Sequence, residues 1–317
     1  ENNLNVVGVE LGSELSNKSY FDKGYTIDEY LYSAKELSKY IKSVFPAIKT
    51  AIVAAPIVES KEHRHSVWNK SLSKKNFYDA IIVHSYAKVV KGKDKYGQMI
   101  FEENEGNPEV SFLNYKNRIS SFFNKLYPLE ISTYNSIFKN IPIWITEWNL
   151  QYSKKTGNTL LQSLFVANYF LEILSNKEFK SITLTTFHNL AGRDFGGSVF
   201  QKKNGKTYIQ STFSSIRMIS KIFALDSHSI LKEKIEPDLY KYTIINEEAM
   251  SMIFYINWSN ESKLILENNT LIKKEEMFGA NLFNLSSDDD GIIFSNQIPL
   301  KDKELKAYSL TVFIAND

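Results

Sequence analysis

Two glutamates follow short apolar runs, which is an unusual place for a charged side chain. Glu147 lies within "IPIWITEWNL" (141–150), and Glu14 follows "NVVGVELG" (5–12). A carboxylate is costly to desolvate unless it has partners. Each glutamate is therefore either a structural ion-pair member or a reactive group at the end of a strand, and their matching positions favour the second. Glu10 competes with Glu14, but it lies within the strand, where a buried hydrogen bond is expected.

A pair of facing carboxylates has a defined chemistry. If the two strands belong to a parallel barrel, their carboxyl ends open on the same face, so Glu14 and Glu147 can converge there. Glycoside hydrolysis requires such a pair: one protonated carboxyl donates to the leaving oxygen, and the other, ionised, attacks the anomeric carbon. The charge of one raises the pKa of the other, which separates the two roles.

Other polar side chains lie near the ends of neighbouring strands. His84 and Tyr86 are two residues apart in "FYDAIIVHSYA" (77–87), so they share one side of a strand and either line a site or form a satisfied core pair. His188 lies at the end of a later apolar run, where it lines the site or packs in the core. Trp148 directly follows the second glutamate and either stacks on a ligand or belongs to the core.

Short apolar runs alternate with helical patterns up to about residue 225. The runs predict strands, and apolar residues at three-and-four spacing predict helices. The strands are expected at 5–12, 49–56, 77–87, 141–149 and 179–189, and the helices at 26–45, 110–127, 158–176 and 207–224. Near-continuous apolar strands that alternate with helices are typical of a parallel sheet covered on both sides.

The parallel sheet is predicted to be part of a (β/α)8 barrel rather than a doubly wound sheet. Functional groups at the ends of many separate strands favour a barrel, because a doubly wound sheet concentrates them near one switch point. The best approximation to a nucleotide-binding fingerprint, "GVELGS" (8–13), lacks the third glycine and carries an acidic residue where phosphate would bind. A nucleotide enzyme therefore has little support.

The period of the pattern changes after about residue 226. Stretches such as "SMIFYINWSN" and "ELKAYSLTVFIAND" read as strands separated by turns, with no convincing helix. This part is predicted to be a small β-sandwich. The expected division is a catalytic domain over 1–225 and a β-sandwich domain over 226–317.

Composition excludes several classes of function. Lys and Arg number 38 and Asp and Glu 36, so the net charge of +2 gives no argument for nucleic-acid binding. The sequence has no cysteine, which excludes disulfides, thiolate nucleophiles and cysteine-based metal sites. No apolar stretch approaches the ~18 residues needed to span a bilayer.

Two further stretches offer metal-binding alternatives. "ESKEHRHSVWN" (59–69) holds two histidines, but their spacing is not that of a helical pair, so a loop on the active face is favoured. Contact of Arg64 or Trp68 with substrate is the less favoured alternative for that loop. "SSDDDG" (286–291) weakly resembles a calcium loop, and a hairpin turn is the favoured interpretation. We expect no metal and no other cofactor.

Taken in order, the motifs resemble those of the clan A glycoside hydrolases. "ELGSE" (10–14) resembles the segment that carries the acid/base at the end of their fourth barrel strand, and "ITEWN" (145–149) resembles the nucleophile segment of the seventh. "VHSY" (83–86) resembles the histidine and tyrosine motif of the sixth. The trailing β-domain is similar to that of the α-L-arabinofuranosidase, β-xylosidase and heparanase-like families, so the resemblance covers essentially the whole chain.

The resemblance implies a role for each candidate residue. Glu14 would be the general acid/base and Glu147 the nucleophile of a retaining mechanism, with the carboxyl groups ~5–5.5 Å apart. Tyr86 would contact the nucleophile, and His84 and His188 would line the sugar subsite.

The sequence departs from the clan pattern in two ways. The clan has an asparagine before the acid/base, where it contacts the sugar 2-hydroxyl, and here Ser13 occupies that position with a shorter side chain that lacks the amide. If the first strand corresponds to barrel strand four, strands one to three lie elsewhere. We therefore expect a preceding segment on the order of 100–200 residues, either cleaved or carried by a second chain.

The leading hypothesis is a retaining glycoside hydrolase that acts on an oligosaccharide or polysaccharide outside the cell, in the periplasm or at the cell surface. The alternative is a carbohydrate-binding protein on the same scaffold that has lost turnover, a reading prompted by Ser13. Under both hypotheses we expect the protein to bind carbohydrate, not to bind nucleic acid and not to span a membrane.

Overall fold

The computed structural model describes most of the chain. The described residues are 5–57, 62–94, 99–102, 104, 106–139, 141–151, 153–192, 197–225, 229–246, 249–265, 271–285, 291–300 and 302–315. They form two compact units. Unit 1 comprises 1–102, 124–148 and 178–188, and unit 2 comprises 103–123, 149–177 and 189–317. Among the described residues, no helix is both long and apolar enough to cross a membrane.

Unit 1 is built on a five-stranded sheet in the order β1-β2-β3-β6-β7. The strands are β1 (Gly8–Leu11), β2 (Lys49–Val53), β3 (Ala80–Ala87), β6 (Ile143–Leu150, whose last two residues lie in unit 2) and β7 (Ile182–Phe187). The pairs β1–β2, β2–β3 and β6–β7 are parallel. The five predicted strands are therefore confirmed, with bounds shorter by one to three residues at most of their ends.

The sheet curls, and the packing of its inner face shows how strongly. The ring of Trp144 on β6 lies over Gly8 on β1, although two strands separate β1 from β6 in the sheet, and a Cβ at Gly8 would come within 2.1 Å of that ring. Only a curved sheet brings those two strands so close. The mixed α/β fold with a curled parallel sheet is consistent with the predicted partial barrel. Glu14 follows β1, and Glu147 lies near the end of β6.

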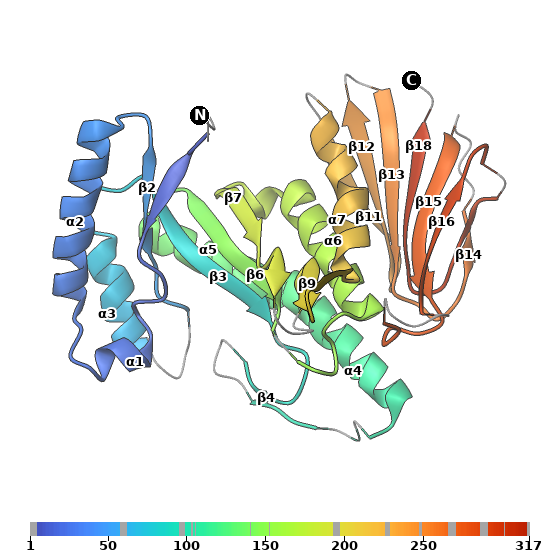
Figure 1. Cartoon of the computed structure of the whole chain (residues 1–317), viewed down its shortest axis with the longest axis horizontal. Coiled ribbons are helices and arrows are strands. Elements are labelled where there is room, and N and C mark those ends of the chain that lie inside the picture. Colours follow the sequence, from blue (N-terminus) through green and yellow to red (C-terminus); the bar gives the residue numbers. More distant parts are fainter. Residues whose placement is uncertain are drawn as a thin grey trace. The chain divides into compact units, whose positions relative to one another are not determined.

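The helices of unit 1 cover the outside of the sheet (Figure 1). They are the short α1 (Lys18–Phe21), α2 (Ile27–Val44), α3 (Glu62–Leu72) and α5 (Tyr127–Phe138). Helix α2 begins with a capping box, because the side chain of Thr26 accepts from the backbone N–H of Glu29 while the Glu29 carboxylate accepts from the Thr26 N–H.

Side chains from α2 and α3 hold the carboxyl ends of the first two strands. The hydroxyl of Tyr30 donates to the carbonyl of Leu11 at 2.9 Å and accepts from the N–H of Val53 at 2.7 Å. Trp68 stacks on Tyr30 with ring centroids 5.1 Å apart, and its indole N–H donates to the Val53 carbonyl. The backbone that precedes Glu14 is therefore anchored by buried hydrogen bonds.

Two expectations for unit 1 are wrong. Residues 62–69 were expected in a loop, but they belong to α3, and Trp68 is buried at 5% exposure, so it does not face a ligand. Glu10 was expected to make a buried hydrogen bond, but its side chain is exposed.

A second helix in the region between β3 and β6 was not predicted. Helix α4 (Pro108–Ser121) continues through a π-helical turn (Phe122–Leu126) into α5. Pro128 in the first turn of α5 lacks an N–H and interrupts the regular hydrogen-bond ladder. That interruption is why the sequence pattern indicated one helix ending near residue 127.

Unit 2 contains helices and a small sheet in addition to its β-domain. Besides α4, these are α6 (Leu160–Ser175), α7 (Thr212–Ile219) and the strands β8 (Ala191–Gly192), β9 (Phe200–Lys203) and β10 (Lys206–Ile209). The helix predicted from residue 207 is wrong in its first turn, because 206–209 form a hairpin with β9. Asn204 and Gly205 both have positive φ, as a tight hairpin turn requires, and this Asn-Gly signal was present in the sequence.

The β-domain of unit 2 is antiparallel, as expected for the strands after residue 226. Its main sheet has six strands in the order β11-β12-β13-β18-β15-β16, and β14 pairs with β17. The strands are β11 (Ser229–Glu236), β12 (Leu239–Asn246), β13 (Ala249–Asn257), β14 (Lys263–Leu264), β15 (Leu271–Gly279), β16 (Ile292–Gln297), β17 (Glu304–Leu305) and β18 (Ser309–Ala315). Leu305 of β17 packs into the core cluster of the main sheet. The β-sandwich assignment and the boundary at 225/226 stay predictions, and most of "SSDDDG" lies outside the described residues.

Candidate functional site

Glu14 stands on a tight turn directly after β1. Gly12 has a φ of +107°, a conformation that side chains rarely adopt, and a Cβ there would come within 2.6 Å of Leu15. Glu14 itself has a φ of 49°, in the left-handed region. A non-glycine residue in this region costs of order 1 kcal/mol or more, and such strain is concentrated at functional sites. The turn projects the carboxylate away from the strand, where Asn17 donates to it at 2.8 Å.

Glu147 is positioned by an irregularity in β6. The register of β6 with β7 runs from Ile145 opposite Thr185 to Trp148 opposite Phe187, so two residues of β6 face one residue of β7. An extra residue of this kind bends a strand and redirects its side chains. The Thr186 hydroxyl donates to the carbonyl of Thr146 at the same place. The bulge accounts for a partly exposed Glu147 beside a fully buried Trp148.

The predicted catalytic and histidine–tyrosine residues meet in one cluster within unit 1. His84 Nδ1 lies 3.0 Å from Glu14 Oε1 and 3.5 Å from Glu147 Oε2. The hydroxyl of Tyr86 donates to Glu147 Oε2 at 2.7 Å. One oxygen of each carboxylate and the His84 nitrogen all lie within 4.8 Å of one another. His84 thus stands between two glutamates that are 133 positions apart in the printed sequence.

The charges in this cluster support one another. The hydrogen bond from His84 lowers the pKa of Glu14, against the opposing effect of burial. Burial by itself would lower the pKa of His84, but the hydrogen bond to Glu14 and the charge of Glu147 outweigh it and raise that pKa. Burial, together with the bond to Glu147, raises the pKa of Tyr86. Glu14 is therefore favoured as an anion beside a protonated His84, and Tyr86 keeps its proton as a donor.

The remaining predicted site residues differ in their placement. His188 is exposed, and its ring lies edge-on to Tyr86 with centroids 6.1 Å apart. Ser13 is exposed on the turn next to Glu14. Trp148 is fully buried and packs edge-on against Phe187 at 5.2 Å, so the core interpretation of this tryptophan fits the structure.

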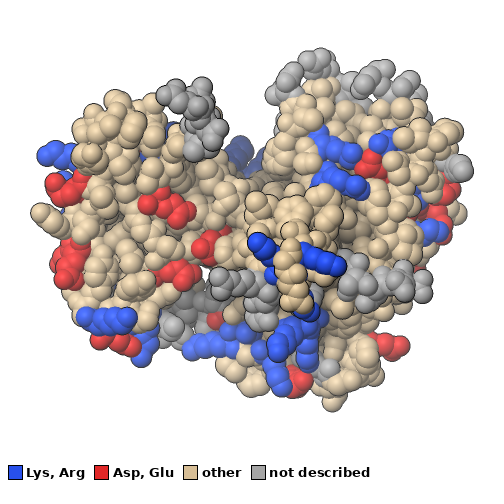
Figure 2. All heavy atoms as spheres, in the orientation of Figure 1, with Lys and Arg blue, Asp and Glu red and all other residues tan. Residues whose placement is uncertain are grey.

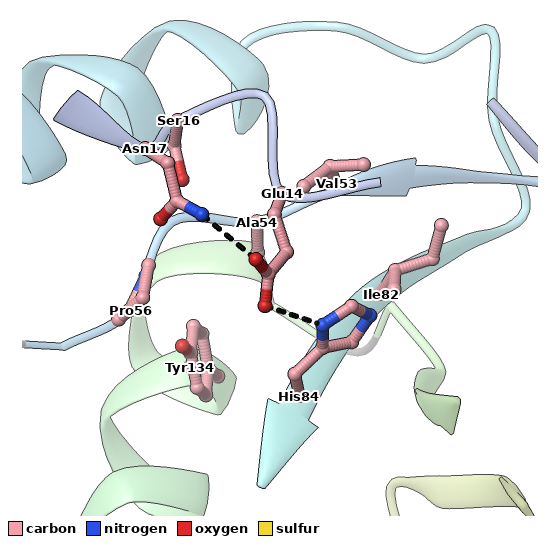
Figure 3. A pocket seen from close by; sticks show the side chains of 9 residues that line it. All are labelled: Glu14, Ser16, Asn17, Val53, Ala54, Pro56, Ile82, His84 and Tyr134. Atoms are coloured by element: carbon pink, nitrogen blue, oxygen red, sulfur yellow. Dashed lines mark hydrogen bonds and ion pairs between the residues drawn. The ribbon is translucent and has the colours of Figure 1, made fainter. Parts of the chain in front are cut away.

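A small pocket of about 40 Å³ adjoins Glu14 (Figure 3). Its polar wall is formed by Glu14, Ser16, Asn17 and His84, while Tyr134, Ile82 of β3 and the chain at the end of β2 form the rest. Figure 3 shows the Glu14 carboxylate between Asn17 and His84, which approach it from opposite sides. Asn17 was not identified from the sequence, although an amide three residues after a strand-end carboxylate was a usable signal.

The same cluster could also hold a metal ion. Glu14, His84 and Glu147 each offer one ligand atom at suitable mutual spacing. However, each carboxylate already accepts a hydrogen bond from a neutral donor, Asn17 for Glu14 and Tyr86 for Glu147. These hydrogen bonds favour two carboxylates that act without a metal ion, each in its own role.

Comparison with solved structures identifies the fold. The GH51 arabinofuranosidase from Xanthomonas axonopodis pv. citri matches with a TM-score of 0.64 at 11% identity, over 96% of this chain and 65% of its own. The GH51 α-L-arabinofuranosidase from Thermotoga petrophila RKU-1 matches with a TM-score of 0.61 at 15% identity, over 97% and 66%. This chain thus spans about two thirds of their length.

A more distant match is the 4-O-α-L-rhamnosyl-β-D-glucuronidase from Fusarium oxysporum 12S, with a TM-score of 0.58, 13% identity, and coverage of 97% of this chain and 70% of its own. No protein-family description matches the sequence. No curated protein matches it either. The structural likenesses establish that the chain has the fold of the clan A glycoside hydrolases.

Proposed function

We propose that this protein is a retaining glycoside hydrolase, with Glu147 as nucleophile and Glu14 as general acid/base. The observation that supports it most is the separation of the carboxylates, one oxygen of each lying within 4.8 Å of the other. Retaining enzymes hold these groups ~5–5.5 Å apart, whereas inverting enzymes separate them by ~6.5–9.5 Å to admit a water molecule. The fold supports the same reaction class.

The surroundings of the two carboxylates support this division of roles. Glu147 accepts a hydrogen bond from the Tyr86 hydroxyl, which orients its carboxylate for attack. Glu14 is more exposed, at 50% of its side chain against 30% for Glu147, and it adjoins the pocket of about 40 Å³, which has room for a water molecule. An acid/base must reach the leaving group and then a water molecule in turn.

His84 supplies a route for the proton. In the free protein the Glu14–His84 pair shares one proton that rests on His84, held there in part by the charge of Glu147. As Glu147 attacks the anomeric carbon and the bond to the leaving oxygen breaks, Glu147 loses its charge, and the proton of His84 passes through Glu14 to that oxygen. Glu14, again ionised, then takes a proton from the water that cleaves the ester. That proton returns to His84, and Glu147 is released as a carboxylate.

The substrate class is carbohydrate, and the placement of the site in the cell follows from it. A polysaccharide is met outside the cell, in the periplasm or at the cell surface, and we propose one of these locations. We also propose that a further segment, in the same chain before cleavage or in a second chain, completes the barrel around the site. Figure 2 shows both basic and acidic side chains on the face in view, separated by areas that carry neither.

The test compares the full-length protein with its Glu147→Gln variant on a panel of glycans and aryl glycosides. Arabinofuranosides come first, because two of the structures with this fold carry that activity in their names. Sugar release that is lost in Glu147→Gln, with the anomeric configuration of the first product retained by NMR, supports the proposal. Release with inverted configuration, or release that survives in Glu147→Gln, contradicts it.

Treatment with a chelator tests the alternative that Glu14, His84 and Glu147 bind a metal ion. Activity that is unchanged after treatment with EDTA is expected for two free carboxylates. Loss of activity in EDTA, with recovery on adding a divalent cation, would instead assign Glu14, His84 and Glu147 to a metal centre.

A further inference from the structure

A larger pocket lies within unit 2, between α4 and the loops of the β-domain. It encloses about 490 Å³, rising to about 1020 Å³ when the open space at its mouth is included. Pockets that bind small ligands typically measure ~300–1,000 Å³. Its lining residues are Glu109, Phe112, Leu113, Lys116, Trp258, Asn260, Ala280, Asn281, Leu282 and Tyr308. No residue of the catalytic cluster contributes to it.

Aromatic rings form part of the pocket wall. The rings of Phe112 and Tyr308 are nearly parallel, with an interplanar angle of 12° and centroids 6.0 Å apart. Phe283 stacks on Phe112 at 4.3 Å and fixes its orientation. Rigid aromatic faces contribute contact area at a low cost in conformational entropy, and they pack well against the C–H faces of a sugar ring.

Polar groups in the pocket are available to a ligand. Among the described residues, the Tyr308 hydroxyl, the Asn260 amide and the Glu109 carboxylate have no hydrogen-bond or ion-pair partner. Lys116, by contrast, is paired with Asp238 at 2.7 Å. These free groups include both donors and acceptors, as a polyhydroxylated ligand requires.

The backbone at Tyr308 is held in a costly conformation. Its φ is 45°, in the left-handed region, and its N–H donates to the carbonyl of Ser259 at 3.0 Å. Backbone strain of this kind persists only where the surroundings enforce it, and it accumulates at binding sites. The turn between β17 and β18 therefore presents the Tyr308 ring to the pocket.

We propose that this pocket binds a neutral oligosaccharide segment as a non-catalytic subsite for the polymer that the enzyme cleaves. The proposal rests on the proposed function for the identity of that polymer. The Glu109 carboxylate is unpaired and would repel an anion, whereas the Lys116 ammonium is already paired with Asp238. These charges disfavour a phosphate or a polyanionic ligand. Parallel rings and unpaired amide and hydroxyl groups favour sugar.

The experiment is affinity electrophoresis of the full chain in gels that contain soluble arabinan, arabinoxylan, xyloglucan or mixed-linkage β-glucan. For the gels every protein also carries Glu147→Gln, so that polymer binding is measured without cleavage, while the hydrolysis assays use the same proteins with Glu147 intact. The test variants are Tyr308→Ala and Asn260→Ala, and Tyr208→Ala is the matched control because Tyr208 is an aromatic residue of unit 2 that is 46% exposed and lies outside the pocket. Hydrolysis of a small aryl glycoside and thermal unfolding are followed for every variant.

We expect retardation by at least one polymer, with the dissociation constant raised about tenfold by Tyr308→Ala and severalfold by Asn260→Ala, and unchanged in Tyr208→Ala. Aryl glycoside hydrolysis should be the same in all of them. Because Asn260 is an exposed side chain, its variant keeps the test valid if Tyr308→Ala unfolds.

Unchanged retardation in both test variants would overturn the subsite, as would the absence of retardation by every polymer. Failure of the proposed function has a different signature. In that case the wild-type protein hydrolyses no aryl glycoside, whatever the gels show.

Discussion

At the scale of single residues, the hydrogen bond from Tyr86 to Glu147 is the contact that most directly prepares the proposed nucleophile. Hydrogen bonds to charged groups contribute about 1.5–3 kcal/mol. If that energy orients the attacking oxygen, Tyr86→Phe should lower kcat/KM by about 10- to 100-fold. The matched control is Tyr78→Phe, which removes a buried hydroxyl that donates to the Leu72 carbonyl in the same unit. Equal losses in the two variants would show a purely structural effect.

The paired charges of Glu14 and His84 should make stability depend on pH. The raised pKa of His84 contributes stability that is fully present below its unfolded value of 6.5 and is lost as pH rises through the folded pKa. The lowered pKa of Glu14 contributes stability that is present above its unfolded value of 4.5 and is lost as pH falls through the folded pKa. Stability from this pair is therefore greatest between those two limits.

Urea unfolding across this range tests the pair. The free energy of unfolding of the wild-type protein should fall above pH 6.5, the unfolded pKa of His84, more steeply than that of His84→Gln. Glu14→Gln should show the same flattening, because His84 then loses the partner that raises its pKa. Parallel pH profiles for the wild-type protein and both variants would disprove the coupling.

At the scale of elements, the turn after β1 decides whether Glu14 reaches the site. Gly12→Ala places a side chain where φ is +107° and a contact with Leu15 at 2.6 Å must be relieved. We expect a loss of about 1–3 kcal/mol in stability and a fall in activity as the turn shifts. Gly24→Ala is the control, because Gly24 also has a positive φ, of +83°, but open space around it.

Gly24→Ala should lose stability from strain alone and keep its activity. The measurements are thermal unfolding and aryl glycoside kinetics on both variants. If Gly12→Ala loses no more activity than Gly24→Ala, the turn does not position Glu14.

The periodicity of the sequence predicted the strands that carry the site residues. It did not predict the local irregularities that orient their side chains. The apolar runs located the five strands of unit 1, because parallel strands buried on both faces leave a strong signal. The bulge at Thr146 and Glu147 left no signal, since it arises from the pairing of β6 with β7. For that reason the sequence left Trp148 open between ligand platform and core.

At the scale of the whole molecule, the convergence of Glu14 and Glu147 depends on the curl of the sheet. Trp144 packed over Gly8 brings β1 and β6 together across the inner face, which no local sequence pattern specifies. The order of strand-end motifs did predict the result, because parallel strands in a barrel open on one face. Two features could be recognised only by comparison with a family pattern. One is Ser13, which stands where the pattern has an asparagine, and the other is the part of the fold that the compared structures contain beyond this chain.

The central claim is that Glu147 attacks the sugar. The most direct measurement is intact-protein and peptide mass spectrometry of the full-length Glu14→Gln variant after brief reaction with an aryl glycoside whose leaving group needs no protonation. Without the base that activates water, the covalent intermediate should accumulate. We predict a mass increase of one glycosyl unit, located on the peptide that contains Glu147 and absent in the Glu14→Gln/Glu147→Gln double variant. Rapid release of the aryl group with no adduct, or an adduct on another residue, would contradict the assignment.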